Sequence, residues 1–370
     1  MGMETIRINP DIDFIEFLKK DSGSDLSICM QCGSCTAVCD LSPDENPFPR
    51  KEMIWAGWGL KDRLMADEDI WLCHQCGDCS ATCPRDVRPA DVMASARNYA
   101  YQHFARPRFL GRWLQSPKYL PLLIMIPALI IAGIIALAGT LKIPEGPVDY
   151  SHFFPHEWLN GSFSVLVLIL VILMVGSVKK FYSGLRVAGS PDKSGSLLRS
   201  DALRVEKRST LKRMWEIFIQ KDFRSCTTNR FRYIGHYMVF GGFMMLLVVT
   251  LFAILATIFF EYPMPFFHPV KIAGNLAGVS LAIGIVFLAI NRFKNPSGSK
   301  AGQYTDWFFL INLFLLAISG GIVELARFMD WSPWAYYLYF VHLVLVWLVV
   351  LYLPYTKFAH VIFRTIAMLK

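Results

Sequence analysis

The feature that most constrains this chain is a cysteine run from Cys73 to Pro84. Its four cysteines are separated by two, two and three residues, and a proline follows the last one. Bacterial ferredoxins use this spacing for [4Fe–4S] clusters, with the fourth cysteine turned toward a second cluster. A second copy lies 44 residues upstream, from Cys29 to Cys39. Gly33 and Gly77 take the same place in the two copies, where a tight turn between ligands favours glycine.

The ferredoxin spacing predicts that the two copies exchange their fourth ligands. We expect one cluster on Cys29, Cys32, Cys35 and Cys83, and the other on Cys73, Cys76, Cys79 and Cys39. A pair of zinc sites is the first alternative, but zinc usually takes two close pairs of ligands well apart. A disulfide framework is the second, and a reducing compartment disfavours it.

Composition divides the chain into a soluble and a membrane part. Of the 370 residues 54% are hydrophobic, too many for an ordinary soluble protein, whereas 18% are charged, too many for a chain that lies wholly in a membrane. Eight of the nine cysteines precede residue 84. We expect an all-α protein with a helical ferredoxin domain at 1–110, a linker and first transmembrane helix at 111–161, and a five-helix membrane domain at 162–370; the loop charges and histidines described below predict that the first is cytoplasmic and the last binds haem b.

Six apolar runs are long enough to cross a hydrocarbon core of about 30 Å. They lie approximately at 119–141, 162–178, 233–260, 271–291, 304–326 and 336–356. No strand alternation separates the cysteine runs, so we expect helices there, including Ile12–Lys19, Lys51–Met65 and Asp91–Phe104.

Loop charge predicts the orientation. The basic loop at 180–232 has thirteen lysines and arginines against five acids, and the loop at 292–303 has three basic residues and no acid. The connections at 142–161, 261–270 and 327–335 are acidic or nearly neutral. The positive-inside rule therefore places the basic loops, and with them the cluster domain, in the cytoplasm of a multi-pass inner-membrane protein. Residues 1–28 contain no apolar segment, which agrees with a cytoplasmic N-terminal end.

Part of the basic loop, Leu197 to Ile219, is predicted to form an amphipathic helix. Its apolar side is available either to lie on anionic lipid headgroups or to dock a soluble subunit, and the sequence leaves both open. That side contains Leu203, Leu211, Met214, Trp215 and Phe218. The ninth cysteine, Cys226, stands alone and is interpreted as a packed or free thiol.

Histidines at membrane depth indicate haem. An ionisable residue in a membrane helix is costly and suggests a function. His236 and His360 are predicted at similar depth near the cytoplasmic side, and two neutral imidazoles facing each other suit a b-type haem. No Cys-x-x-Cys-His motif occurs, which argues against covalent attachment. Gly241 and Gly242 are expected to let a porphyrin edge approach the backbone.

His342 is a candidate for a second haem. It precedes His360 by five whole turns, so a continuous helix would place both on one face, roughly 27 Å apart, whereas a kink at Pro354 between them would weaken this relation. Its predicted partner is His268, with His152 and His156 as alternatives and a single haem if none reaches it. His268 and Lys271 are also the candidate quinone-binding residues, because both can donate hydrogen bonds.

These residues together resemble a known family. A helical double-cubane domain fused to a haem b membrane domain resembles the C subunit of the quinone-interacting membrane-bound oxidoreductase complex of sulfate reducers, which looks like a fusion of the C and E subunits of heterodisulfide reductase. The resemblance covers 29–83 and about 162–364, and residues 223–243 are similar to the start of a haem-bearing helix in the E subunits of the related reductases. The last five spans also resemble the nitrate reductase gamma subunit, whose second helix has two histidines where this chain has only His236.

The resemblance implies a membrane electron-transfer subunit that exchanges electrons between menaquinone and soluble flavin and iron–sulfur subunits, toward adenylylsulfate reductase. No nucleotide-binding fingerprint and no nucleic-acid partner is expected. Three alternatives remain: reversed flow from quinol to a heterodisulfide- or sulfite-linked reductase, a membrane redox sensor without haem, and a plain anchor. The sequence does not decide the haem count, the direction of flow, the side of the quinone site or the oligomeric state.

Overall fold

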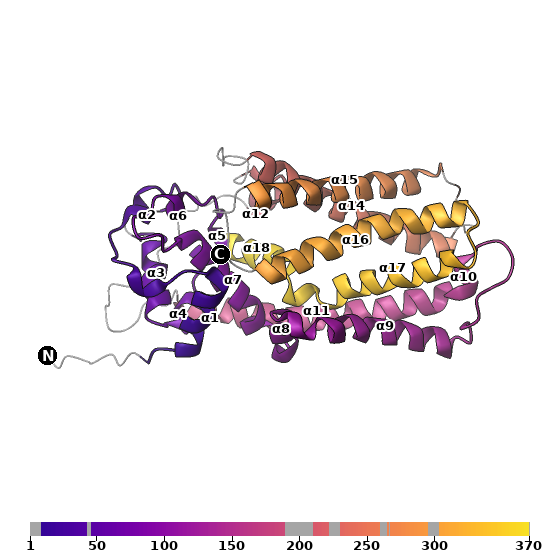
Figure 1. Ribbon diagram of the computed structural model, residues 1–370, viewed down its shortest axis with the longest axis horizontal. Coiled ribbons are helices and arrows are strands. Elements are labelled where there is room, and N and C mark those ends of the chain that lie inside the picture. Colours follow the sequence, from indigo (N-terminus) through magenta and orange to yellow (C-terminus); the bar gives the residue numbers. More distant parts are fainter. Residues whose placement is uncertain are drawn as a thin grey trace.

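A small helical domain stands at one end of a long bundle of helices (Figure 1). The computed structural model describes residues 9–42, 46–188, 210–221, 230–259, 265, 267–294 and 303–369. Every regular element within these ranges is a helix, as the sequence predicts. The predicted helical stretch from Lys51 to Met65 is divided at Gly59, whose φ of 66° is left-handed and whose Cβ position lies 2.9 Å from the Asp11 backbone.

The N-terminal domain is built from short helices around the two cysteine runs, with the long helix α7 beside them. Asp11 caps the first helix by accepting a hydrogen bond from the Phe14 N–H at 2.9 Å. The elements are α1 (Ile12–Ser22), η1 (Leu26–Ile28), α2 (Ser34–Ala37), α3 (Arg50–Gly57), α4 (Lys61–Met65), α5 (Asp69–Leu72), α6 (Asp78–Ala81), α7 (Pro89–Phe104) and α8 (Arg108–Leu114).

Six helices in the described part of the chain are long and apolar enough to cross a membrane, at 117–137, 156–185, 231–256, 269–294, 304–328 and 334–351. The bundle is therefore that of a multi-pass membrane protein, and the second span is much longer than the sequence pattern indicates. The elements are η2 (Pro117–Tyr119), α9 (Leu120–Leu137), α10 (Tyr150–Phe153), α11 (His156–Ala188), α12 (Thr210–Phe218), α14 (Arg230–Phe259), α15 (Pro269–Lys294), α16 (Gln303–Phe328), α17 (Trp334–Leu351), η4 (Leu353–Tyr355) and α18 (Phe358–Leu369).

The last helix is not continuous, which corrects one expectation. Helix α17 ends at Leu351, the turn η4 follows, and α18 begins at Phe358. Pro354 supplies no backbone N–H to continue the helix. The Tyr352 hydroxyl donates to the Leu123 carbonyl at 3.0 Å, and the Tyr355 hydroxyl donates to the Arg106 carbonyl at 2.6 Å. His342 and His360 therefore belong to different helices, and the prediction that they share one helical face is wrong.

Gly242 also differs from its predicted role. Its Cβ position lies 2.8 Å from the Ala277 carbonyl, so its missing side chain lets α14 and α15 touch instead of admitting a cofactor. Gly235 and Gly284 make a second close approach between the same two helices. Gly241 has open space where a side chain would stand.

One hydrophobic core joins the cluster domain to the bundle. Trp71 of α5 is fully buried against Phe181 of α11 and Phe363 of α18. Phe104 of α7 packs on the same two phenylalanines. Because these side chains form a single cluster, the cluster domain and the helix bundle share a hydrophobic core and are packed directly against each other.

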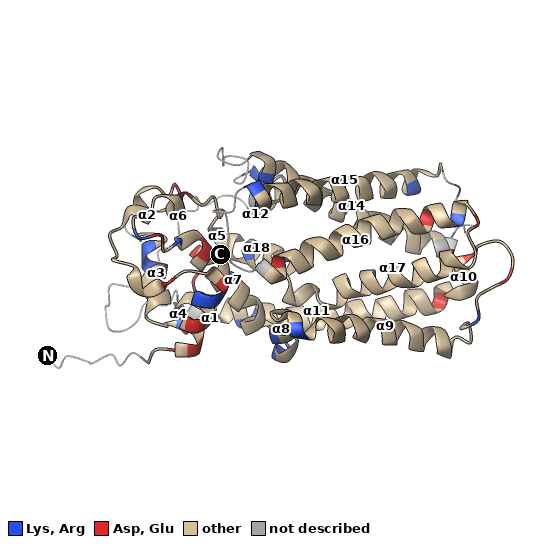
Figure 2. Cartoon of the chain, in the orientation of Figure 1, with Lys and Arg blue, Asp and Glu red and all other residues tan. Residues whose placement is uncertain are grey.

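Charge follows the same division. In Figure 2 lysine, arginine, aspartate and glutamate gather in the cluster domain and near the two ends of the bundle, while the middle of the bundle is almost free of them. This is the distribution that a hydrocarbon core requires, since unpaired charge is costly there.

Candidate metal centre

The two cysteine runs repeat in backbone geometry as well as in sequence. Gln31 and Gln75 have left-handed φ angles of 56° and 53°, and Gly33 and Gly77 follow with 84° and 98°. Each glycine then starts a one-turn helix, α2 or α6. The expectation that these glycines serve tight turns is consistent with this geometry.

The first predicted ligand set surrounds one hollow. A hollow at the first run is lined by Cys29, Cys32, Cys35 and, from the second run, Cys83. Arg50 of α3 stands at its wall. Four thiols on one hollow are the donor set of a cubane, so these residues fit a [4Fe–4S] cluster.

The second set converges in the same crossed manner. Burial raises the pKa of Cys39 to about 12, and the neighbouring thiolates of Cys73 and Cys76 raise it further. Burial likewise raises the pKa of Cys79, with Cys73, Cys76 and Cys39 again nearby and Cys35 of the other set also contributing. Buried thiols of this kind give up their protons when a metal replaces them, so metal uptake here is coupled to proton release.

Polar groups point at several of the sulfurs. The Gln31 amide donates to Cys29 Sγ and the Gln75 backbone N–H donates to Cys73 Sγ, both at 3.3 Å. Hydrogen bonds to cluster sulfurs are one of the means by which a protein sets the reduction potential. In both runs the glutamine two residues after the first cysteine thus donates to its sulfur, through the side chain in the first run and through the backbone in the second.

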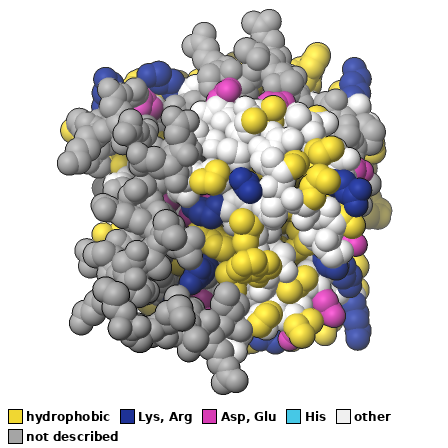
Figure 3. Space-filling model, turned by 90° about the vertical axis from the view of Figure 1, so that its left-hand side faces the viewer, with side chains coloured by type: hydrophobic (Ala, Val, Ile, Leu, Met, Phe, Trp, Pro, Cys, Tyr) yellow, Lys and Arg dark blue, Asp and Glu magenta, His cyan; other side chains and the backbone are white. Residues whose placement is uncertain are grey.

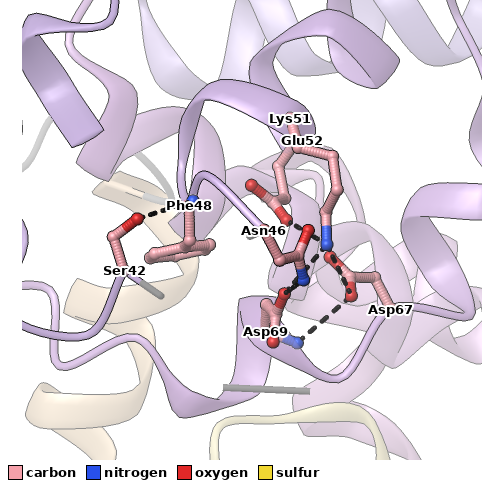
Figure 4. A network of polar contacts seen from close by, with 7 residues as sticks. All are labelled: Ser42, Asn46, Phe48, Lys51, Glu52, Asp67 and Asp69. Carbon is pink, nitrogen blue, oxygen red and sulfur yellow. Dashed lines mark hydrogen bonds and ion pairs between the residues drawn. The ribbon is translucent and has the colours of Figure 1, made fainter. Parts of the chain in front are cut away.

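A buried acidic group is formed by residues that lie between the two cysteine runs in the sequence (Figure 4). Glu52, Asp67 and Asp69 each bring a carboxylate oxygen to within 4.8 Å of the others. The Lys51 ammonium sits among them, 2.9 Å from Asp69 Oδ2 and 3.0 Å from Glu52 Oε1. Burial raises the pKa values of Glu52 and Asp67. Because the ammonium takes the place that a metal cation would need, we interpret this group as an ion-pair network.

The second cysteine loop is fastened to the membrane helices by arginines. Arg364 of α18 donates to the Cys73 carbonyl at 3.4 Å, and Arg232 of α14 donates to the Gln75 carbonyl. From its own domain Arg97 donates to the Ile70 carbonyl at 2.6 Å and to Gln75 Oε1 at 2.9 Å. These contacts turn the second cysteine loop toward the bundle.

The predicted histidine pair lies directly beneath that loop. His236 follows Arg232 by one turn of α14, and His360 precedes Arg364 by one turn of α18. The His360 ring is 6.2 Å from the Trp71 ring, centroid to centroid. Burial lowers the pKa of His360 well below its ordinary value, and the charges of Arg364, Arg97 and His236 lower it further. The His360 imidazole is therefore neutral and close enough to His236 to feel its charge, as expected if the two rings bind the same metal ion.

His342 and its predicted partners lie farther along the bundle. His342 Nδ1 is 2.8 Å from the Ser319 hydroxyl of α16, a contact that leaves Nε2 available. His268 Nδ1 accepts the Val270 N–H at 3.3 Å at the start of α15. Lys271 pairs with Glu324 at 3.3 Å. The contacts of His342 and His268 are thus made to different groups, and their pairing as haem ligands stays a prediction.

Several residues of the site carry little or no signal in the sequence. Arg232 and Arg364 stand four residues from a predicted haem histidine, a spacing from which they could have been found. Ser319, Arg97 and Trp71 carry no local signal, because their partners are distant in sequence. Cys226, Leu203 and most of the basic loop lie outside the described residues.

The fold and the cysteine site define an iron–sulfur electron-transfer subunit embedded in a membrane. Residues 25–87 match the 4Fe-4S dicluster domain family, and residues 114–370 match the citrate utilization protein B family. The chain belongs to the citrate utilization protein B family, since that match covers more than half of it. No solved structure matches the chain significantly.

Curated relatives fall into two kinds. Citrate utilization protein B of Escherichia coli is 28% identical over 367 residues, covering 96% of this chain and 83% of the relative. The C subunit of the H(2):CoB-CoM heterodisulfide,ferredoxin reductase of Methanothermobacter marburgensis is 40% identical over 93 residues, 25% of this chain and 50% of the relative. The E subunit of the dihydromethanophenazine:CoB–CoM heterodisulfide reductase of Methanosarcina mazei is 24% identical over 231 residues, 56% of this chain and 89% of the relative.

Proposed function

We propose that this chain carries electrons between menaquinone in the cytoplasmic membrane and a soluble flavoprotein oxidoreductase, through two [4Fe–4S] clusters and haem b. One observation carries the proposal: the helices of His236 and His360 also bring Arg232 and Arg364 to the second cysteine loop. A cluster and a haem would thus be fixed next to each other by the same two helices. In electron transfer between bound cofactors, the role of the protein is to position the cofactors and to set their reduction potentials.

The crossed ligand sets are part of the proposal. The hollow lined by Cys29, Cys32, Cys35 and Cys83 supports the first cluster, and the convergence of Cys39 with the Cys73 run supports the second. The first cluster would be the outer one. Its end of the molecule shows apolar side chains among lysines and arginines where the structure describes it (Figure 3), a surface on which a soluble subunit can dock.

Haem b is proposed between His236 and His360, where it would supply one-electron redox chemistry. The half-buried imidazole of His360, whose pKa is lowered well below its ordinary value, fits a haem ligand. A second haem is proposed on His342, whose ring the Ser319 contact orients, and His268 stays its proposed partner ligand. His268 and Lys271 remain the proposed quinone residues, with Glu324 now beside Lys271.

Orientation and lipid contact complete the proposal. The basic loops and the cluster domain are placed in the cytoplasm by the positive-inside rule. The apolar side of α12, formed by Leu211, Met214, Trp215 and Phe218, is at least half exposed. Phe218 touches Phe240 of the spanning helix α14, so this side continues a lipid-facing surface. We therefore assign it to membrane lipid, with the rest of the predicted amphipathic helix outside the described residues.

Two soluble partners are considered. The resemblance to the sulfate reducers' subunit suggests flow from menaquinol toward adenylylsulfate reductase. The match to citrate utilization protein B over 96% of this chain favours a second candidate, a soluble oxidoreductase of citrate utilization. We propose the same cofactors for both candidates, which differ in the soluble partner.

The test uses purified protein in vesicles with a menaquinone analogue. Dithionite-reduced protein should be reoxidised when the oxidised analogue is added, first in its haem absorption and then in the EPR signals of the clusters. The His236→Ala variant should keep reducible clusters that the analogue no longer reoxidises at the original rate. Equal reoxidation of the clusters in this variant would contradict the proposed route.

A further inference from the structure

The chain that follows the C-terminal end of the short helix α12 contacts His236. Its last hydrogen bonds join the Ile219 N–H to the Trp215 carbonyl at 2.9 Å and the Gln220 N–H to the Ile217 carbonyl at 3.1 Å. Gln220 then has a φ of 53°, a left-handed conformation that residues with a side chain rarely adopt. The helix is thereby stopped at this residue.

The strained turn coincides with one specific contact. Gln220 Oε1 lies 3.1 Å from Nδ1 of His236, sixteen residues away on α14. A strained residue persists only where its surroundings hold it, and such residues gather at functional sites. The contact that Gln220 makes in this conformation is to His236, a predicted haem ligand.

Helix α12 is held firmly enough to aim this side chain. Its Glu216 is buried and forms an ion pair with Lys221 at 3.1 Å. Its Ile217 packs against the core that joins the cluster domain to the bundle. The helix also packs on α18, which carries His360, so one short element contacts the helices of both predicted ligands.

The hydrogen bond selects one form of the imidazole. A neutral histidine has one N–H, and an amide oxygen can only accept. With the proton on Nδ1 the lone pair is on Nε2, where it can bind iron. Metal-binding histidines are commonly oriented by a bond of this kind, which also sets how basic the ligand is.

We propose that Gln220 is a positioning residue for His236: its amide oxygen holds the Nδ1–H, turns Nε2 toward the haem between His236 and His360, and helps to set the haem's reduction potential. This inference rests on the proposed function, because it needs the haem. It adds a residue that the cysteine and histidine patterns do not reveal.

The experiment compares Gln220→Glu, Gln220→Leu and the control Gln115→Leu in the full-length protein. Gln115 makes a hydrogen bond of similar length, 3.3 Å to the Asn98 carbonyl, at a distant place in the fold. The readouts are the haem midpoint potential, the low-spin haem EPR spectrum and haem retention. The EPR signals of the two clusters report that each variant is folded.

Gln220→Glu should lower the midpoint potential, because a carboxylate draws the Nδ1 proton and makes His236 a stronger donor to ferric iron. Gln220→Leu should change the haem EPR spectrum and weaken haem retention about 10–100-fold. Gln115→Leu should leave all haem readouts unchanged. If Gln220→Leu does not fold, the midpoint potential of the near-isosteric Gln220→Glu variant tests the proposal alone.

Two failures are distinguishable. Unchanged potentials and spectra in both Gln220 variants, with haem that is lost in His236→Ala, would overturn this inference and leave the proposed function standing. A haem that survives intact in His236→Ala would contradict the ligand assignment itself, and both proposals would fall.

Discussion

Arg364 donates a hydrogen bond to the carbonyl of Cys73 at 3.4 Å, across the boundary between the membrane bundle and the cysteine domain. Arg364 lies one helical turn beyond His360, and Arg232, one turn before His236, makes the corresponding contact to Gln75. Each predicted haem ligand is thus tied through its own helix to the same cysteine loop. The distance between the two sites is set by packing and does not depend on a linker.

This arrangement predicts a kinetic effect without a loss of cofactors. Replacing Arg232 and Arg364 together by Met should slow electron transfer between the second cluster and the haem by roughly tenfold or more, because small misplacements of reacting centres have large rate effects. Freeze-quench EPR after rapid mixing with reductant measures the rate. Lys20→Met together with Arg63→Met, two exposed positions elsewhere in the cluster domain, is the matched control. Equal rates in the double variant and the control would contradict the role of these contacts.

The crossed wiring predicts which cluster each cysteine supports. Cys39→Ser should damage the cluster held by Cys73, Cys76 and Cys79, and Cys83→Ser should damage the one held by Cys29, Cys32 and Cys35. EPR of each reduced variant distinguishes them by comparison: under the crossed wiring Cys39→Ser should leave the same cluster signal as Cys76→Ser, and Cys83→Ser the same signal as Cys32→Ser. Loss of the cluster of its own run in either variant would exclude the crossing.

The sequence predicts most of the cluster domain and the number of spans, because cysteine spacing and apolar length are local patterns. The sequence does not predict features that depend on contacts between residues far apart along the chain. The final helix ends at Leu351 because Pro354 lacks a donor and because Tyr352 and Tyr355 are anchored on Leu123 and Arg106, far upstream. Gly242 looks the same in sequence whether it admits a cofactor or a neighbouring helix, and only its contact with α15 distinguishes the two.

The shared core predicts a stability effect at Trp71. Trp71→Ala should cost about 3–5 kcal/mol in the free energy of unfolding of the cluster domain, because it leaves a cavity among Phe181, Phe363 and Tyr101. Trp71→Phe should cost less. Denaturant titration followed by cluster absorbance measures both. A Trp71→Ala variant with the stability of the original protein would mean that the two halves are not packed as described.

His103 predicts a pH dependence. Burial lowers the pKa of His103 from its ordinary 6.5 to about 4, and the neighbouring charges of Lys180 and Arg108 add to the effect. Its contribution to stability is complete above the unfolded pKa, about 6.5, and is lost as the pH falls toward 4, since the unfolded chain then binds the proton more strongly. His103→Gln should flatten this part of the curve. Thermal unfolding at several pH values tests it, and an unchanged curve would contradict the burial of His103.

The most direct test of the electron route is the cofactor content of the purified protein and of its His236→Ala and His360→Ala variants. The account predicts about eight non-haem irons per chain in all three proteins, as two [4Fe–4S] clusters require. It predicts the reduced absorption band of a b-type haem in the original protein and the loss of that same haem in each variant. A colourless membrane half, zinc in place of iron, or a full haem content in either variant would contradict it.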